Sequence, residues 1–246
     1  MKDGLWQALE MLKEDFKIVK KNVAKDYLGL GRDFKFVLVW GAWGSPQDKF
    51  GRTFDCKKGI CIAGNVVKPI KPNDYDVLFY ETKWYQPEIK FHKRIVHAFG
   101  MNRREFKNLH MDRDIDYLGV GAFALWKRWD EFSKLSGYRV VVGEVQVDNM
   151  EESMSIWNRL TENGVHCQTM VTTRKLSVLY NRAKTVFIPA DINGGGERAI
   201  LEARACGCDI QIMPDNPKLL ELLDCPMYDE NYYYRKLKEG ITACVS

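Results

Sequence analysis

The stretch DINGGGERAILEARACG, residues 191–207, joins three consecutive glycines to the pattern of a short amphipathic helix. The run TVFIP at 185–189 has the composition of a buried strand and leads into it. A glycine loop between a strand and a helix lets a ligand approach the backbone, because no Cβ stands in the way. The exposed N–H groups and the helix dipole there favour anions and hydroxyl oxygens. The stretch therefore predicts a phosphate and sugar site, with a plain strand-to-helix turn as the alternative.

Two carboxylates accompany this glycine loop. Glu197 lies in the first turn of the predicted helix, where the helix dipole stabilises a negative charge. Glu202 lies five residues further on, which places the two carboxylates about one and a half turns apart. Together they favour a functional site more strongly than the glycines do alone, since short glycine motifs also match by chance.

The segment resembles the carboxylate motif of retaining glycosyltransferases with the GT-B fold, in which two Glu residues flank part of the glycine loop and helix. LEARACG, residues 201–207, matches the second half of that motif, whereas Gly194 stands where the first Glu is expected. The resemblance implies that Glu202 binds the ribose of a nucleotide and that Glu197 takes the catalytic role. It also implies donor contacts from Gly194, Gly195, Gly196 and Arg198.

Further motifs occur in the order of the same family over about residues 94–245: HAFG, VGAF, VGE, LYNRA, GGGER and LEARACG. The resemblance implies an α/β fold with two Rossmann-like lobes. The second lobe is expected to be a doubly wound parallel sheet, and the first lobe is expected to be trimmed.

A second donor segment is VGAFALWKRW, residues 120–129, in which Ala122 replaces the Arg that usually follows VG in the family. The resemblance implies that Gly121 together with Lys127 or Arg128 grips the diphosphate of the donor. Two further donor contacts are implied by their positions: Thr173 near the base and Gly41 in the loop after the first strand.

Two lobes are also expected from the pattern of elements. From Asp114 onward strands and helices alternate regularly, which predicts a parallel doubly wound sheet. A polar, charged stretch at 103–113 marks the boundary between the lobes. We therefore expect a first lobe at 1–110, a second lobe at 111–230 and a C-terminal helix at 231–246 that crosses back to the first lobe. At the start of the chain, apolar residues at helical spacing predict one amphipathic helix over 4–25.

The predicted strand at 76–80 ends at polar and aromatic residues. Ligands bind outside the carboxyl ends of strands in open α/β sheets. We therefore expect acceptor contacts from Glu81, Trp84 and Tyr85, with ordinary surface aromatics as the alternative. His97, in the short strand RIVHAFG, is the candidate for a second catalytic group beside Glu197.

Charge is unevenly distributed along the chain. Residues 1–110 hold 21 Lys and Arg against 13 Asp and Glu, and the remainder of the chain is acidic. A basic half can meet a polyanion or an anionic membrane surface, with a solvated lysine-rich surface as the alternative. We therefore expect an acceptor that is anionic or lies on an anionic surface, either a lipid or polysaccharide precursor or hydroxylated bases in DNA. The apolar positions of the first helix permit a homodimer.

No apolar run approaches the ~20 residues that cross a bilayer, and residues 1–25 lack the apolar region of a signal peptide. The seven cysteines lack metal-ligand spacing, which fits reduced thiols. A cytoplasmic location is therefore expected.

These patterns favour a retaining glycosyltransferase that uses a nucleoside-diphosphate sugar. No metal or cofactor is expected to be required, because basic side chains and helix N-termini can carry the phosphate charge. The alternative is a non-catalytic nucleotide-sugar-binding or scaffold protein, which Gly194 and Ala122 motivate. An oxidoreductase would need GxGxxG after its first strand, and GAWGSP at 41–46 fits that motif poorly.

Overall fold

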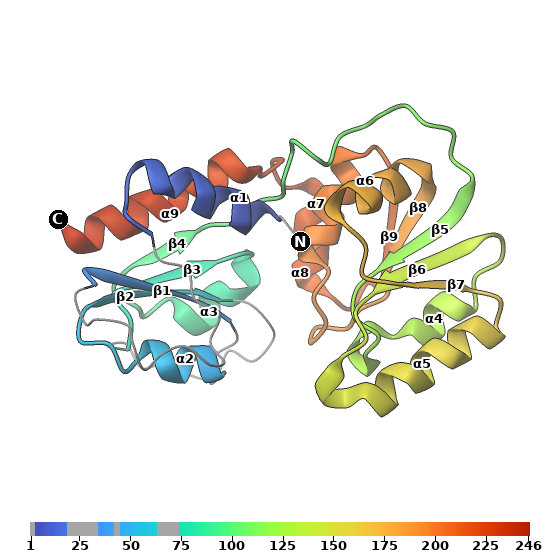
Figure 1. The fold of residues 1–246 in the computed structure, drawn as a ribbon, viewed down its shortest axis with the longest axis horizontal. Coiled ribbons are helices and arrows are strands. Elements are labelled where there is room, and N and C mark those ends of the chain that lie inside the picture. The colour runs from blue at the N-terminus through green and yellow to red at the C-terminus, as the bar shows by residue number, and fades with distance from the viewer. Residues whose placement is uncertain (1–2, 19–33, 42–44, 63–73) are drawn as a thin grey trace. The chain divides into compact units, whose positions relative to one another are not determined.

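A computed structural model describes residues 3–18, 34–41, 45–62 and 74–246. They form two compact units, each with its own parallel sheet (Figure 1). The five-stranded unit consists of Asp3 and Met101–Met227. The four-stranded unit consists of Gly4–Gly100 and Tyr228–Ser246.

The sheet of the five-stranded unit has the order β7-β6-β5-β8-β9, and all neighbouring strands are parallel. Its strands are β5 (Ile115–Val120), β6 (Arg139–Gly143), β7 (His166–Thr169), β8 (Ala183–Ile188) and β9 (Asp209–Ile212). Apolar, β-branched runs form the central strands because helices cover both faces of the sheet. The expected doubly wound parallel sheet is therefore confirmed.

Two groups of helices cover the two faces of this sheet (Figure 1). One face carries α4 (Trp129–Ser133) and α5 (Met150–Glu162), which follow the 3-10 turns η4 (Leu125–Lys127) and η5 (Val147–Asn149). The other face carries α6 (Thr173–Arg182), α7 (Glu197–Ala205) and α8 (Pro217–Asp224).

The chain order reverses at β5 in this sheet. From β5 the chain runs outward through β6 and β7, and it then returns to β8 on the other side of β5. The connections that leave the carboxyl ends of β5 and β8 therefore diverge to opposite faces. Open α/β sheets bind ligands at such a switch point.

The sheet of the four-stranded unit has the order β1-β2-β3-β4 and is also parallel throughout. Its strands are β1 (Phe36–Gly41), β2 (Lys57–Ile62), β3 (Val77–Tyr80) and β4 (Ile95–His97). Its helices are α1 (Gly4–Met11), η1 (Leu12–Glu14), α2 (Pro46–Gly51), η3 (Lys83–Tyr85), α3 (Gln86–Ile89) and α9 (Glu230–Val245).

Strand β3 shows how both faces of this sheet are buried. Val77 and Phe79 point into a core with α1 and α9, whereas Leu78 and Tyr80 point into a second core with Tyr85 and the end of α3. This alternation follows from the two-residue period of a strand. Both ends of the described chain thus contribute to one unit.

The boundary between the units differs from the one expected at residues 110 and 111, because residues 101–110 pack with the five-stranded unit. The ring of Phe106 meets that of Tyr180 edge-on, with centroids 5.7 Å apart. The side chain of Asn181 donates to the carbonyl oxygen of Lys107 at 3.0 Å and accepts from the backbone of Leu109 at 2.6 Å. These contacts hold the polar stretch onto α6.

The first expected helix is shorter than predicted. The helix expected over 4–25 ends at Met11 and continues only as the 3-10 turn to Glu14, while residues 19–25 lie outside the described ranges. In the five-stranded unit, α4 begins at Trp129, because Arg128 has φ of 50° and separates it from η4. Thr172 caps α6, since its hydroxyl accepts from the backbone N–H of Lys175.

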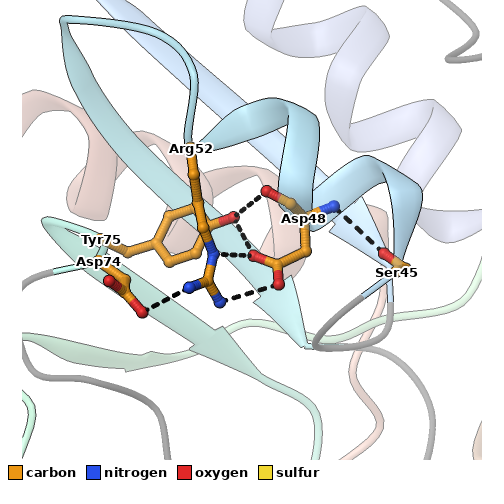
Figure 2. Close-up of polar contacts among 5 residues, drawn as sticks. All are labelled: Ser45, Asp48, Arg52, Asp74 and Tyr75. Atoms are coloured by element: carbon orange, nitrogen blue, oxygen red, sulfur yellow. Dashed lines mark hydrogen bonds and ion pairs between the residues drawn. The ribbon is translucent and has the colours of Figure 1, made fainter.

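A polar cluster around the buried carboxylate of Asp48 connects α2 to the residues just before β3 (Figure 2). The carboxylate of Asp48 accepts from Nε and Nη2 of Arg52, both at 2.9 Å, and from the hydroxyl of Tyr75 at 2.6 Å. Arg52 also pairs with Asp74 at 2.7 Å, and the hydroxyl of Ser45 caps the helix. Burial raises the pKa of Tyr75, and the neighbouring Asp48 adds to the shift.

Within the ranges that the structure describes, no helix combines the length and the apolar content that crossing a membrane demands.

Candidate functional site

Two loops meet at the carboxyl ends of β5 and β8. The first follows Val120 and the second follows Ile188, and these strand ends are neighbours in the sheet. The backbone N–H of Asp191 donates to the carbonyl oxygen of Trp126 at 3.0 Å, which joins the loops. A Cβ at Gly194 would lie 2.6 Å from the same carbonyl oxygen, so the close approach of the loops requires glycine there.

Lys127 connects the two loops through its side chain. Its exposed fraction is 7%, and its ammonium group donates to the carbonyl oxygen of Gly195 at 2.6 Å. A Cβ at Gly121 would lie 2.8 Å from Cε of Lys127, so this glycine makes room for the lysine. Burial lowers the pKa of Lys127 to about 8; Glu197 opposes this shift, Lys218 adds to it and Asp191 opposes it.

Glu197 is buried at the start of α7, and both of its carboxylate oxygens are engaged. Oε2 accepts from the backbone N–H of Gly196 at 2.9 Å. Oε1 forms an ion pair with Lys218 of α8 at 3.0 Å. Lys218 is itself fully buried, and its ammonium lies 3.5 Å from the carbonyl oxygen of Gly194.

Lys218 was not among the site residues expected from the sequence. Its only local signal is Pro217, which marks the first turn of a helix. The contact with Glu197 arises because α8 packs beside α7, and a pattern within one segment does not reveal such a neighbour.

Glu202 belongs to a different set of contacts within α7. It is buried, and its Oε2 accepts from the hydroxyl of Tyr180 at 2.9 Å. Burial raises the pKa of Glu202 to about 7, against the opposing effects of Arg198 and Tyr180. Arg198, expected to contact the donor, forms an ion pair with Asp3.

Lys127 and Arg128, the two expected diphosphate ligands, have different surroundings. Lys127 is enclosed by the glycine loop, whereas Arg128 forms a two-point contact with Asp215 at 3.0 and 2.7 Å. Arg128 is in the left-handed backbone region, which turns its side chain away from the direction a continuous helix would give. Of the two, Lys127 is the one that the structure brings to the glycines.

Two further expected donor residues have no printed contact with this loop cluster and lie in other elements. Thr173 is the first residue of α6, directly after the capping Thr172. Gly41 ends β1 in the four-stranded unit, and the loop that follows it at 42–44 lies outside the described residues.

His97, the second catalytic candidate, lies at the end of β4 in the four-stranded unit. Its Nδ1 is 2.8 Å from the hydroxyl of Tyr232, and its Nε2 is 3.0 Å from the carbonyl oxygen of Glu81. Because a carbonyl oxygen only accepts, Nε2 carries the proton and Nδ1 accepts from Tyr232. Burial lowers the pKa of His97, against the effect of the Glu81 carbonyl. Both ring nitrogens are thus engaged within the unit.

The three expected acceptor residues follow β3, as predicted, but they differ in exposure. Glu81 and Trp84 are half-buried. Tyr85 is fully buried in the core beneath α3, with its ring edge-on to that of Trp84. Its side chain therefore lies in the interior and not at the surface where it was expected.

Aspartates at alternate positions, a pattern that can bind metal ions, occur at 74–76 and 112–116, although no such triplet was expected. In the structure four of these carboxylates pair with basic side chains: Asp74 with Arg52, Asp76 with Lys57, Asp114 with Arg182 and Asp116 with Lys184. Among the residues that the structure describes, no three His, Cys, Asp or Glu side chains are grouped as ligands of a metal ion.

No protein-family model matches this chain, and no curated protein matches it. The structure of sucrose-phosphate synthase from Thermosynechococcus elongatus aligns with a TM-score of 0.58 at 14% identity, over 87% of this chain and 70% of that one. AviGT4, a glycosyltransferase involved in avilamycin A biosynthesis, aligns with a TM-score of 0.54 at 12% identity, over 81% and 77%. HepE of Anabaena, in complex with UDP and glucose, aligns with a TM-score of 0.53 at 12% identity, over 78% and 62%.

The likeness extends to both units, since it covers 78–87% of this chain in these three structures. This chain spans 62–77% of their lengths. At identities of 12–14% the comparison establishes the fold and nothing finer. The chain has the GT-B fold, with two Rossmann-like parallel α/β units that show four and five strands among the described residues, and the expected fold class is confirmed.

Proposed function

We propose that this chain is a glycosyltransferase that takes its sugar from a nucleoside-diphosphate sugar. The observation that carries the proposal is the Lys127 ammonium, which is buried against the glycine loop at the switch point of the five-stranded sheet. The loop opens α7, so its backbone N–H groups and the positive end of the helix dipole lie beside the ammonium.

This arrangement suits the departure of a diphosphate. Transfer of the sugar leaves negative charge on the phosphate oxygens, and donors fixed in advance stabilise such charge most strongly where water is excluded. A buried ammonium meets that condition, since its interaction with an anion is screened less than at a surface. The same chemistry supports transfer without a metal ion.

The named neighbours support the donor class. HepE was solved with UDP-glucose as well as with UDP and glucose. AviGT4 is described as a glycosyltransferase. Because the likeness shows only the fold, the donor of this chain follows from Lys127 and the glycine loop as a proposal.

Retention of configuration and an anionic acceptor, or one on an anionic surface such as a membrane or DNA, remain part of the proposal. The basic composition of residues 1–110 supports such an acceptor. The contacts of Glu197 with Lys218 and Gly196 favour a role in organising the loop over a role as a base.

The proposal is tested by thermal unfolding with UDP, GDP, ADP and dTDP. A ligand at a hundred times its dissociation constant should stabilise the wild type by about 2.7 kcal/mol. Lys127→Ala should abolish this ligand-dependent shift. Arg128→Ala is the matched control, because it removes an exposed ion pair from the adjacent position and should keep the shift. If none of the four stabilises the wild type at millimolar concentration, the proposal is wrong.

One observation favours a non-catalytic nucleotide-sugar-binding protein. Gly194 has no room for the Glu that the resemblance expects there, since even a Cβ would meet the Trp126 carbonyl oxygen at 2.6 Å. Donor hydrolysis distinguishes the two functions. Release of the nucleoside diphosphate from UDP-glucose, lost in Lys127→Ala, supports the enzyme, whereas binding without release supports the alternative.

A further inference from the structure

Lys218 is a buried lysine that contacts Glu197 and Gly194 of the glycine loop. Its exposed fraction is 0%, and an ammonium removed from water is costly unless partners compensate it. The ion pair with Oε1 of Glu197 at 3.0 Å and the Gly194 carbonyl oxygen at 3.5 Å supply that compensation. The lysine thus binds both ends of the segment from Gly194 to Glu197.

The same segment is held from its other side by Lys127. The carbonyl oxygen of Gly195 accepts from Lys127 at 2.6 Å. A Cβ on Gly195 would lie 3.5 Å from Oε2 of Glu197 and 3.8 Å from the Lys127 ammonium. The ammonium groups of Lys127 and Lys218 therefore both bind the short segment from Gly194 to Glu197. The Glu197 carboxylate lies between Lys218 and the loop backbone.

The position of Lys218 is itself fixed by Asn216, which precedes α8. The side-chain amide of Asn216 donates to the carbonyl oxygens of Ala190 and Asp191, at 3.1 and 2.8 Å. The start of α8 is therefore tied to the loop that leaves β8. The backbone that carries Lys218 is thus anchored next to this loop.

We propose that Lys218 is a positioning residue for the diphosphate of the donor, because it holds the segment from Gly194 to Glu197 so that Lys127 faces the phosphate. This inference rests on the proposed function. Lys218 acts through Glu197 and the loop carbonyls, and it adds a second positive charge behind the loop. Three charged groups face Lys127 from the elements packed against it: Glu197 of α7, Lys218 of α8 and Asp191 of the loop after β8.

The test compares the wild type with Lys218→Met, which keeps the length of the side chain and removes its charge. Titration calorimetry with UDP, GDP, ADP and dTDP is run between about pH 7 and pH 10, where the second phosphate ionisation, with a pKa of about 6, is complete. In the wild type, affinity should be constant up to about pH 8 and then fall, because Lys127 loses its proton and binding needs the protonated form.

Lys218→Met should weaken affinity at least tenfold at pH 7, and the pH at which affinity begins to fall should rise. This pH should rise because the substitution removes the positive charge of Lys218, which lowers the pKa of Lys127. It also frees the Glu197 carboxylate, which raises that pKa, from its ion pair with Lys218. A loss of packing alone does not raise that pH. Lys184→Met, at the exposed amino end of β8, is the matched control and should bind as the wild type does.

The double variant Glu197→Gln/Lys218→Met removes both partners of the ion pair. It keeps the test possible if Lys218→Met alone fails to fold. Its stability should return toward that of the wild type, since replacing both partners leaves no unpaired buried charge. Its affinity should stay weak. Wild-type affinity with an unchanged pH profile, in either folded variant, overturns the inference while the proposed function stands. Failure of the wild type to bind any of the four diphosphates overturns both.

Discussion

Lys127 and Glu202 are buried titratable groups of the same unit, and burial moves their pKa values toward neutrality from opposite directions. The pKa of Lys127 falls to about 8, and that of Glu202 rises to about 7. Desolvation is the largest cause in both, because it disfavours the charged form of either group. Lys127 meets the glycine loop and Glu202 meets Tyr180. The first shift therefore affects ligand binding, and the second affects stability.

Glu202→Gln should stabilise the five-stranded unit at pH 8 and leave its stability nearly unchanged at pH 5. Because the folded-state pKa of about 7 lies above the ordinary 4.5, the folded state binds the proton more tightly. Stability is therefore lost as pH rises through that interval. Gln has no charge to desolvate, and its oxygen can still accept from Tyr180. At about 1.4 kcal/mol per pKa unit, the gain at pH 8 is about 3 kcal/mol at most.

Urea unfolding of the wild type and Glu202→Gln across this pH interval measures the difference. Glu162→Gln, at the exposed end of α5, is the control and should show no trend with pH. A stabilisation by Glu202→Gln that stays the same at every pH would show that desolvation of the carboxylate is not its cause.

The site residues that follow strand ends were predictable from the sequence, whereas Lys218, which reaches Glu197 from another helix, was not. Lys127 and Glu197 lie next to glycine turns that the sequence displays. No local sequence pattern identifies Lys218 as a site residue, because its contact with Glu197 depends on the packing of α8 on α7. Tyr85 was expected at the surface, but its ring fills the core under α3, where a local pattern cannot distinguish the two placements.

At the scale of elements, the site depends on how closely β6 approaches the end of β5. A Cβ at Gly143, the last residue of β6, would lie 1.9 Å from the carbonyl oxygen of Gly121. That oxygen belongs to the backbone, so the strand end would have to shift. Gly121 in turn packs against the side chain of Lys127, which links the strand contact to the proposed donor site.

Gly143→Ala should therefore destabilise the five-stranded unit by about 3 kcal/mol or more, at the upper end of overpacking effects. It should also weaken the binding of nucleoside diphosphates. Gly164→Ala is the control, because its Cβ would meet its nearest atom at 3.4 Å and only its φ of 75° is unfavourable. That conformation costs about 1–2 kcal/mol for a residue with a side chain. Equal losses in the two variants, measured by urea unfolding, would contradict the argument.

Most strands were predictable because their apolar runs are bounded by turn residues, as at 76–80 and 185–189. The length of the first helix was not. Apolar spacing continues beyond Glu14, yet Asp15 contacts Tyr234 and Lys238 of α9 after the helix has ended. Such contacts with a helix more than 200 residues away are not visible in the local apolar spacing.

At the scale of the whole molecule, the described residues form two compact units. Each sheet has its own buried clusters, and residues 101–110 pack with the five-stranded unit although their composition suggested a boundary after them. The two parallel sheets were predictable from alternating elements and from the family resemblance. The residue at which one unit ends and the other begins was not predictable. The charged residues at 103–113 indicate an exposed segment, but they do not indicate which unit it contacts.

When the protein is heated, UDP should protect the five-stranded unit more than the four-stranded unit. Cys206 is buried in the five-stranded unit and Cys61 in the four-stranded unit, so their reaction with a thiol reagent reports the opening of each. If UDP binds at Lys127, labelling of Cys206 should shift to higher temperature while labelling of Cys61 shifts less. Mass spectrometry of the labelled peptides measures both in one sample. Equal shifts in the labelling temperatures of Cys206 and Cys61 would show that the two units unfold together.

The four-stranded unit is completed late in synthesis. Tyr233, Leu237 and Ile241 of α9 lie in its core with Val77 and Phe79. At roughly 5–20 residues per second, these α9 residues leave the ribosome after every strand of both sheets. An apolar face of the four-stranded unit therefore stays open until α9 is made, when residues 101–227 have already been translated. We expect this unit to finish folding in the cell after the five-stranded one, which would give chaperones and proteases longer access to it.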